Sequence, residues 1–281
     1  MVVIPHYYGP PSSPSMNYGS SRHRPEVRAA ILHRTVMTLH QTFGQAQCMM
    51  QLARRASEAA NTSLRHELQI IICTVADRHL LCESKLPSAS FEHVVCEVPP
   101  LEIGFFCHRV LASHADSAAW FGFVEDDILV TDPLCLSKLD WFIQHAGADC
   151  VLQANRFERD SRMIATKAYV DGDLHPNLTT AFQNREVSTE FQLDAFGLTL
   201  RMVRPLNPNS SCFFLRQDQL KYWSQQSHCG QPSREFVGPL ESAANLSLMR
   251  TFRVYKPAIE NAGFFEVEHQ SNQFISQLRP R

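Results

Sequence analysis

Residues 121–130 read FGFVEDDILV, an apolar run that is interrupted by three consecutive carboxylates, Glu125, Asp126 and Asp127. The flanking side chains are typical of a strand in a protein interior, and no Lys or Arg lies within five residues of the triplet. Three like charges at the end of a buried strand are unfavourable unless another group compensates for them. The triplet therefore indicates either a bound cation or the start of a solvated loop.

Similar apolar runs occur throughout the first half of the chain. Residues 68–75 (LQIIICTV) are continuously apolar and rich in β-branched side chains, which is typical of a parallel strand covered on both faces. Further strands are predicted at residues 1–5, 93–98, 119–124 and 149–154. The triplet thus follows directly after a predicted strand.

Helical patterns alternate with these strands. Residues 25–43 place apolar side chains at helical spacing after a Pro in the first position. A second clear helix is predicted at residues 132–147, with Asp132 as its N-cap and Gly147 near its end. Residues 45–60 and 101–117 are predicted to be helical as well.

The alternation of strands and helices predicts an α/β protein with a Rossmann-like, mainly parallel central sheet flanked by helices. We expect one domain over residues 1–281, in which residues 1–155 form the half that binds a nucleotide. Residues 156–281 are less regular, with a strand–loop–strand–helix pattern at 197–223. Ligands of such sheets bind beyond the carboxyl ends of the strands, which is where the triplet lies.

Composition and charge narrow the class of protein. The 281 residues carry 26 basic and 28 acidic side chains, and a net charge of −2 argues against a partner such as nucleic acid or an anionic membrane surface. No apolar run approaches the length of a transmembrane segment, and the N-terminus lacks the pattern of a signal peptide. Nine cysteines, mostly in apolar runs and without a C-x-x-C pair, favour reduced, buried thiols in a cytoplasmic protein.

The spacing of the triplet suits a metal site. Residues i and i+2 of an extended segment point the same way, so Glu125 and Asp127 share one face while Asp126 points to the other. Two carboxylates that converge at a sheet end suit a hard divalent cation, and that cation can bridge a diphosphate.

The arrangement EDD after FGFV resembles the DxD-type metal motif of glycosyltransferases with the GT-A fold. Those enzymes use a nucleotide-sugar donor and usually Mn²⁺ or Mg²⁺. The resemblance implies that Asp127 contacts the metal, while Glu125 and Asp126 orient the ribose, the sugar or metal-bound water. The triplet is EDD rather than DxD, which leaves the division of labour between Glu125 and Asp126 open.

Other donor contacts follow from the same resemblance. The opening VVIPHYY is similar to the first strand and nucleotide-binding loop of that fold, so Pro5, His6 and Tyr7 would flank the base and ribose. His108 and Arg109, in the segment CHRV, are candidates to face the donor phosphate. A solvated helix face is the alternative explanation for these two side chains.

Glu241 is the candidate catalytic base. It follows a Gly-Pro turn and opens a predicted helix, ESAANLSLMR. GT-A enzymes commonly place an acidic residue at such a helix start, where it accepts the acceptor hydroxyl's proton in inverting transfer. Glu241 would equally complement the positive end of its own helix.

His269 is the second metal candidate. It follows the strand-like run GFFEVE, and many GT-A enzymes bring a C-terminal His or Asp to the metal. A neutral imidazole is a suitable ligand for Mn²⁺ beside carboxylates. An ordinary surface or core histidine is the alternative, and Glu266 and Glu268 beside it are expected on the exposed face of the strand.

Together these features predict a metal-dependent glycosyltransferase of the hexosyltransferase type. The expected donor is a UDP- or GDP-sugar, and the expected acceptor is a hydroxyl of a glycan or small molecule bound by residues 156–281. A sugar-nucleotide nucleotidyltransferase is the enzyme alternative, although residues 6–24 lack its compact Gly-rich phosphate loop. A non-catalytic GT-A-like binding protein is the other alternative, and the intact triplet argues against it.

Overall fold

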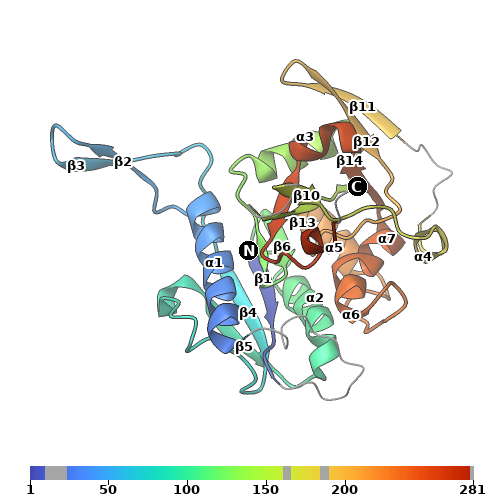
Figure 1. Ribbon diagram of the computed structural model, residues 1–281, viewed down its shortest axis with the longest axis horizontal. Coiled ribbons are helices and arrows are strands. Elements are labelled where there is room, and N and C mark those ends of the chain that lie inside the picture. The colour runs from blue at the N-terminus through green and yellow to red at the C-terminus, as the bar shows by residue number, and fades with distance from the viewer. Residues whose placement is uncertain (10–23, 161–165, 184–189, 279–281) are drawn as a thin grey trace.

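The computed structural model describes residues 1–9, 24–160, 166–183 and 190–278. Its central sheet has five strands in the order β13-β6-β1-β4-β5, which are Cys212–Arg216, Trp120–Val124, Val2–His6, Ile70–Val75 and Glu92–Cys96. The strands β6, β1, β4 and β5 are parallel to one another, and β13 runs antiparallel at one edge (Figure 1). The prediction of an α/β fold with a mainly parallel central sheet is confirmed.

Helices cover both faces of this sheet. The first face packs against α1 (Pro25–Phe43) and α3 (Cys135–Ala146), and the second packs against α2 (Ile103–Ser113) and α5 (Gln217–Ser224). Burial on both faces explains why the strand sequences are apolar without alternation. Along β4, for example, Ile70 and Ile72 belong to the hydrophobic core on the first face, whereas Ile71 and Cys73 belong to the core on the second face.

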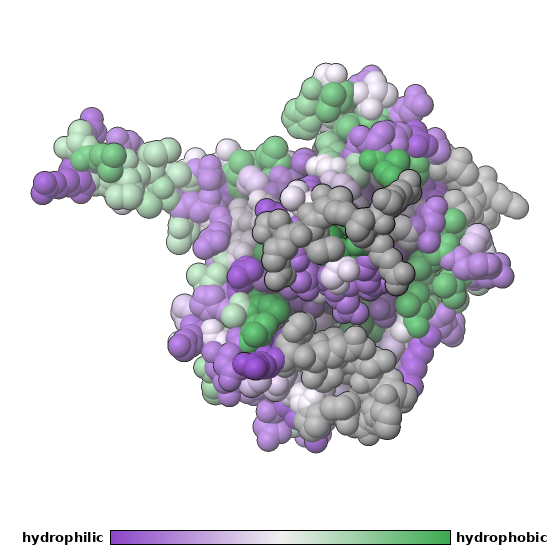
Figure 2. Space-filling view, in the orientation of Figure 1, coloured by the Kyte–Doolittle hydropathy of each residue, from purple (hydrophilic) through white to green (hydrophobic). Residues whose placement is uncertain are grey.

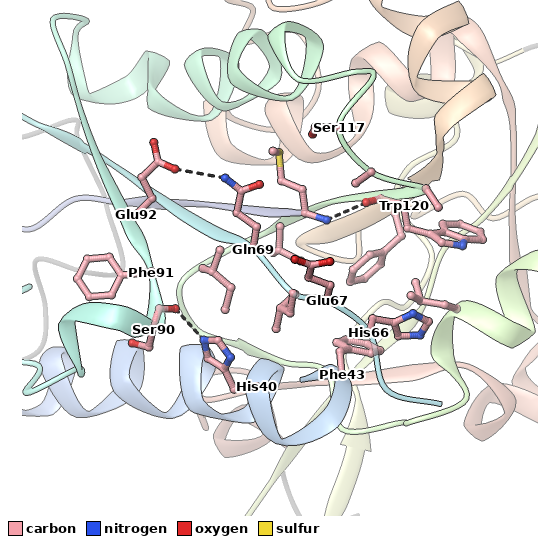
Figure 3. Close-up of a pocket in the computed structure, with 18 of the residues that line it drawn as sticks. His40, Phe43, His66, Glu67, Gln69, Ser90, Phe91, Glu92, Ser117 and Trp120 are labelled. Carbon is pink, nitrogen blue, oxygen red and sulfur yellow. Dashed lines mark hydrogen bonds between the residues drawn. The ribbon is translucent and has the colours of Figure 1, made fainter. Parts of the chain in front are cut away.

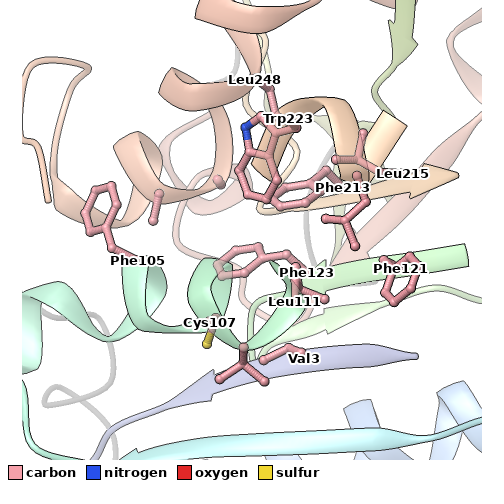
Figure 4. Packing of buried hydrophobic residues seen from close by; sticks show 14 of the residues in the cluster. Val3, Phe105, Cys107, Leu111, Phe121, Phe123, Phe213, Leu215, Trp223 and Leu248 are labelled. Carbon is pink, nitrogen blue, oxygen red and sulfur yellow. The ribbon is translucent and has the colours of Figure 1, made fainter. Parts of the chain in front are cut away.

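The second face has a core of aromatic side chains (Figure 4). The rings of Phe123 on β6 and Phe213 on β13 stack with centroids 5.3 Å apart and planes 11° from parallel. Trp223 on α5 meets Phe213 edge-on, and its indole N–H donates to the Ser247 hydroxyl at 2.7 Å. These contacts pack β6, which leads into the carboxylate triplet, against the edge strand β13 and the helix α5.

Two smaller sheets extend the fold beyond the triplet. One has the order β10-β9-β15-β7, which are Lys167–Tyr169, Asn155–Arg159, Glu266–His269 and Ile128–Leu129. The other has the order β11-β12-β14-β8, which are Glu190–Ala195, Leu198–Val203, Arg253–Pro257 and Cys150–Leu152. Since β7 directly follows the triplet and pairs with β15, His269 lies opposite Ile128. This pairing brings the C-terminal strand to the triplet.

Most of the predicted elements are found, with two differences. Helix α3 begins at Cys135 rather than at residue 132, because the Asp132 carboxylate accepts the N–H of Leu134 in a turn that precedes the helix. The helix predicted at residues 45–60 is wrong: this segment is a hairpin of β2 (Cys48–Gln51) and β3 (Ala56–Ala59). Its residues are good helix formers, but they have no apolar face at helical spacing to bury against the body.

The remaining helical segments are short. They include α4 (Asn177–Thr180), α6 (Pro239–Glu241), a π-helical stretch (Ser242–Leu246) and α7 (Ser247–Thr251). Short 3-10 helices lie at Ser88–Ser90, Pro100–Glu102, Ile259–Phe264 and Ile275–Gln277. Among the residues described, none of the helices combines the length and hydrophobicity that crossing a membrane requires. All nine cysteines are free thiols and six of them are buried, in agreement with the prediction from their apolar surroundings.

Candidate active site at the carboxyl end of the central sheet

The triplet forms the tight connection between β6 and β7. The N–H of Glu125 donates to the carbonyl of Ser211 at 3.0 Å, and the N–H of Ile128 donates back to the carbonyl of Glu125 at 3.1 Å. Asp126 is buried within this turn, whereas Glu125 and Asp127 are half-buried. The compensating positive charges are supplied by side chains from distant parts of the sequence.

Asp126 is an internal anchor. One oxygen accepts from the Arg28 guanidinium of α1 and the other from His6 Nδ1 of β1, both at 2.5 Å. His6 Nε2 accepts the N–H of Leu80 at 3.0 Å, so the proton of the neutral ring is on Nδ1. Both Asp126 oxygens are therefore occupied.

Two of the predicted donor contacts need correction on this ground. Asp126 is 8% exposed and His6 is 0% exposed, and they bond to each other. Neither side chain has a free polar atom for a ribose or a sugar, so their role is to fix the turn between β6 and β7. Pro5 and Tyr7 are also buried beside them, and their contact with a base stays a prediction.

Asp127 faces the other way and keeps one oxygen free. Its Oδ2 lies 3.4 Å from Arg28 Nη1 and 3.7 Å from His269 Nε2, which is too long for a direct hydrogen bond to the imidazole. Its Oδ1 is buried and has no hydrogen-bond partner within the described residues. Burial opposes ionisation, but His269 and Arg28 outweigh it and hold the pKa of Asp127 well below its usual range.

His269 is oriented by a carboxylate that the sequence analysis missed. Its Nδ1–H donates to Glu158 Oε1 at 2.8 Å, which leaves Nε2 directed to Asp127. Glu158 is fully buried on β9, and its other oxygen accepts the N–H groups of Phe274 and Ile275. Although burial lowers the pKa of His269, Asp127 and Glu158 raise it to about 9.

A sequence signal for Glu158 does exist. In the segment NRFER, Arg156 and Glu158 are two positions apart in a strand and so share one face, opposite to Phe157. Two opposite charges on one face of an otherwise buried strand indicate partners in the interior. The structure provides these partners, because Arg156 and Glu158 both point toward the triplet and its neighbours.

Glu125 is backed by a buried network of cations. Arg156 donates to the Ser211 hydroxyl and to Asp171, each at 2.8 Å, and Lys256 donates to Asp171 at 2.7 Å. Burial, with added repulsion from Asp127 and Glu241, raises the pKa of Glu125 to about 8, and Arg156 opposes this shift. Carboxyl groups with a pKa near neutrality are typical of functional sites.

Glu241 lies close enough to this cluster to affect it electrostatically, as its influence on the Glu125 pKa shows. It ends α6 and directly precedes the π-helical stretch, a conformation that is frequent at functional sites. Asn245 of that stretch donates to the Glu241 carbonyl at 2.9 Å and to Asn209 Oδ1 at 2.8 Å. Its own Oδ1 has no hydrogen-bond partner among the described residues.

His108, a candidate phosphate contact on α2, lies in the aromatic core and not at the carboxyl end of the sheet. His108 is fully buried among Phe105, Phe123 and Trp223, and its Nε2–H donates to the Ala243 carbonyl at 2.8 Å. Burial lowers its pKa to about 4. The expectation that His108 faces the donor phosphate is therefore wrong, because an imidazole without a countercharge is more stable as a neutral core side chain.

The metal-ligating prediction can be tested for fit. No group of three or more His, Cys, Asp or Glu side chains within the described ranges is arranged to hold a metal. Asp127 and His269 alone converge, one with an unpaired oxygen and the other with its Nε2 directed at that carboxylate. A carboxylate and an imidazole suit Mn²⁺, and with two protein ligands the ion would take its other oxygens from diphosphate and water. The residues present fit such a site.

Comparison with known proteins adds little to these observations. No protein-family model matches the sequence, and no curated protein matches it either. Among solved structures, the chain is similar to HddC from Yersinia pseudotuberculosis, with 12% sequence identity and a TM-score of 0.39. The similarity covers 91% of this chain and 89% of HddC, and at this level it supports no conclusion about activity.

Proposed function

We propose that the protein is a metal-dependent glycosyltransferase of the GT-A type, which transfers a sugar from a nucleoside-diphosphate donor to an acceptor hydroxyl. The observation that supports this most directly is the convergence of Asp127 and His269 at the carboxyl end of a mainly parallel sheet. The two side chains come from segments that are far apart in the sequence, one in the middle of the chain and one near its C-terminus. Their meeting is the arrangement that the resemblance of the EDD motif implied.

In this proposal Asp127 and His269 hold Mn²⁺ or Mg²⁺, which supplies positive charge to the leaving diphosphate when bound. Glu158 accepts the Nδ1–H of His269 and so holds the ring with Nε2 toward Asp127, where a bound metal ion would replace the Nε2 proton. Arg28 neutralises the buried carboxylates behind the ligand position. The protein thus offers a preorganised charge arrangement, which is the main source of transition-state stabilisation in such reactions.

Glu241 accepts the proton of the acceptor hydroxyl in this scheme. Its half-buried position beside the Glu125 cluster supports this role. Transfer with inversion follows if Glu241 and the leaving diphosphate lie on opposite sides of the reacting sugar carbon. Residues 156–281, which contain Glu241, would bind a glycan or small-molecule acceptor, and the donor would be a UDP- or GDP-sugar.

The proposal is tested by thermal-shift titration with UDP, GDP, CDP and ADP, each with and without Mn²⁺. A ligand at 100 times its Kd adds about 2.7 kcal/mol to the free energy of unfolding. We expect one nucleotide to raise Tm only with metal, and Asp127→Asn to remove the shift. Glu268→Gln is the matched control, because this neighbouring carboxylate pairs with the exposed Arg159 instead.

Product analysis separates this activity from nucleotidyl transfer. Glycosyl transfer releases a nucleoside diphosphate from the sugar donor. In nucleotidyl transfer, a sugar phosphate reacts with a nucleoside triphosphate, and pyrophosphate is released from the triphosphate. Pyrophosphate release that depends on Asp127 would replace the proposed function by its enzyme alternative. Absence of any metal-dependent nucleotide binding would remove both.

A further inference from the structure

The hairpin of β2 and β3 forms an arm that projects from the body of the protein (Figure 1). We use the word arm for residues 45–60. Its large apolar side chains are exposed, with 61% of Met49, 70% of Met50 and 79% of Leu52 open to solvent. Figure 2 shows this extension with hydrophobic residues along it, well separated from the rest of the surface.

An arm of this kind is unusual for an isolated molecule. A lone two-stranded hairpin is only marginally stable in water, and exposed apolar clusters commonly mark interaction sites. The base of the hairpin is nevertheless closed by hydrogen bonds between its two sides, because the N–H of Ala60 donates to the Gln47 carbonyl and Asn61 donates to the Gln47 side chain. The hairpin is therefore a closed element, while both of its strands are left largely exposed by the described residues.

A hollow of about 720 Å³ opens beside the root of the arm, at the amino ends of the parallel strands. Its apolar walls include Phe43, Phe91 and Trp120, and its acidic groups are Glu67 and Glu92. Figure 3 shows these side chains around the hollow, with the Glu67 carboxylate near the centre of the view.

The arm and the hollow are complementary in charge as well as in polarity. At the end of the arm, Arg55 forms no ion pair with any described residue, and Arg54 has only a 3.8 Å contact with Glu58. In the hollow, Glu67 has no ion-pair partner in the described part of the chain. Figure 1 shows the arm extending away from the body of the protein, so contact between these groups requires a second molecule.

We propose that the arm of one molecule docks into the hollow of a second copy of this chain, and that the second copy reciprocates. Phe43 lines the hollow and the arm begins two residues later, so both surfaces lie at one end of the central sheet. An exchange between two such surfaces closes on itself as a two-fold dimer. The dimer would bury Met49, Met50 and Leu52 and leave the carboxyl end of the sheet open.

The test is sedimentation velocity of the full chain over a range of concentrations, with charge-reversal variants. Arg55→Glu and Glu67→Arg should each raise the dimer Kd by about tenfold or more, because each places like charges together. The double variant should restore much of the affinity, since it exchanges the two charges. Met50→Glu tests the apolar contact independently, and circular dichroism checks that each exposed substitution leaves the fold intact.

Each outcome decides the proposal. A dimer that both single reversals weaken and the double reversal restores supports it. A chain that stays monomeric at about 100 μM, far above the Kd of most specific complexes, overturns it. A dimer that is unaffected by these variants also overturns it. Binding of the monomer to anionic vesicles that depends on Arg54 and Arg55, without self-association, would assign the arm to a membrane surface instead.

Discussion

The two ends of the central sheet handle charge and apolar surface in opposite ways. At the carboxyl end, Asp126 and Arg28 are almost fully buried and bond to each other at 2.5 Å. At the amino end, the arm exposes Met50 to solvent, while Arg55 and Glu67 form no ion pair among the described residues. At the carboxyl end, the buried charges are paired within one chain. At the amino end, exposed apolar and charged side chains are typical of a surface that binds a partner.

The largest expected effect is on the buried pair. Replacing Arg28 by Met leaves the Asp126 carboxylate uncompensated, which should lower the free energy of unfolding by about 3–5 kcal/mol. Arg54→Met in the exposed pair of the arm should lower it by less than about 1 kcal/mol. Urea denaturation of both variants measures the difference. Equal effects would show that the two ends of the sheet do not differ in this way.

His108 is buried without a countercharge, so the pH dependence of the free energy of unfolding provides a second test of the comparison. Burial lowers the pKa of His108 to about 4 from an unperturbed 6.5, so its contribution to stability is complete above pH 6.5 and falls as the pH drops toward 4. Between about pH 7.5 and 5 this contribution should decline by about 2 kcal/mol.

His108→Gln should remove that part of the pH dependence, whatever it does to stability at neutral pH. The control is His145→Gln, because His145 is exposed on α3. Urea denaturation at several pH values provides the measurement. A His108→Gln slope identical to that of the wild type would contradict the prediction.

At the carboxyl end, Glu158→Gln tests whether the buried Glu158 carboxylate orients His269, the proposed metal ligand. An amide can still accept from His269 but carries no charge, and we expect the metal affinity to fall by about 10- to 100-fold. The Mn²⁺ concentration that gives half of the nucleotide-dependent thermal shift is the readout. Glu268→Gln should leave it unchanged, and an equal loss in both variants would argue against a specific role for Glu158.

The smallest effect is expected in the arm. Met50→Ser should change the free energy of unfolding of the dilute monomer by no more than about 0.5 kcal/mol, because 70% of Met50 is open to solvent. The same variant should weaken self-association. A large loss of monomer stability would show that the arm contributes to its own fold and would weaken the contrast between the two ends.

Sequence patterns predicted the sheet well and the arm poorly. The continuous apolar runs predicted β4 and β6, and helix α1 has the predicted limits, because burial on two faces and a Pro at the first helical position are local properties. In residues 45–60 helix propensity favoured the wrong element. Propensity decides little where no apolar face is buried, and the structure has a hairpin there.

The candidate site likewise has features that the sequence predicted and features that it did not. The position of the triplet at a strand end and the pairing of Asp127 with a C-terminal histidine were predicted, and in the structure these two side chains lie together. The roles of His6, His108 and Asp126 were not predictable, because each depends on which distant side chain fills its hydrogen bonds. Arg28 was not recognised, since a basic residue on an amphipathic helix is ordinarily exposed.

By itself, therefore, the sequence determined the fold class, most strands and helices, and the end of the sheet where carboxylates gather. Tertiary structure alone decided that Asp126 is neutralised by Arg28, that Glu158 holds His269, and that the arm is left uncovered. The physical reason is the range of the interactions. Burial periodicity is encoded within a few residues, whereas the partner of a buried charge is set by strand order, which brings together segments far apart in the chain.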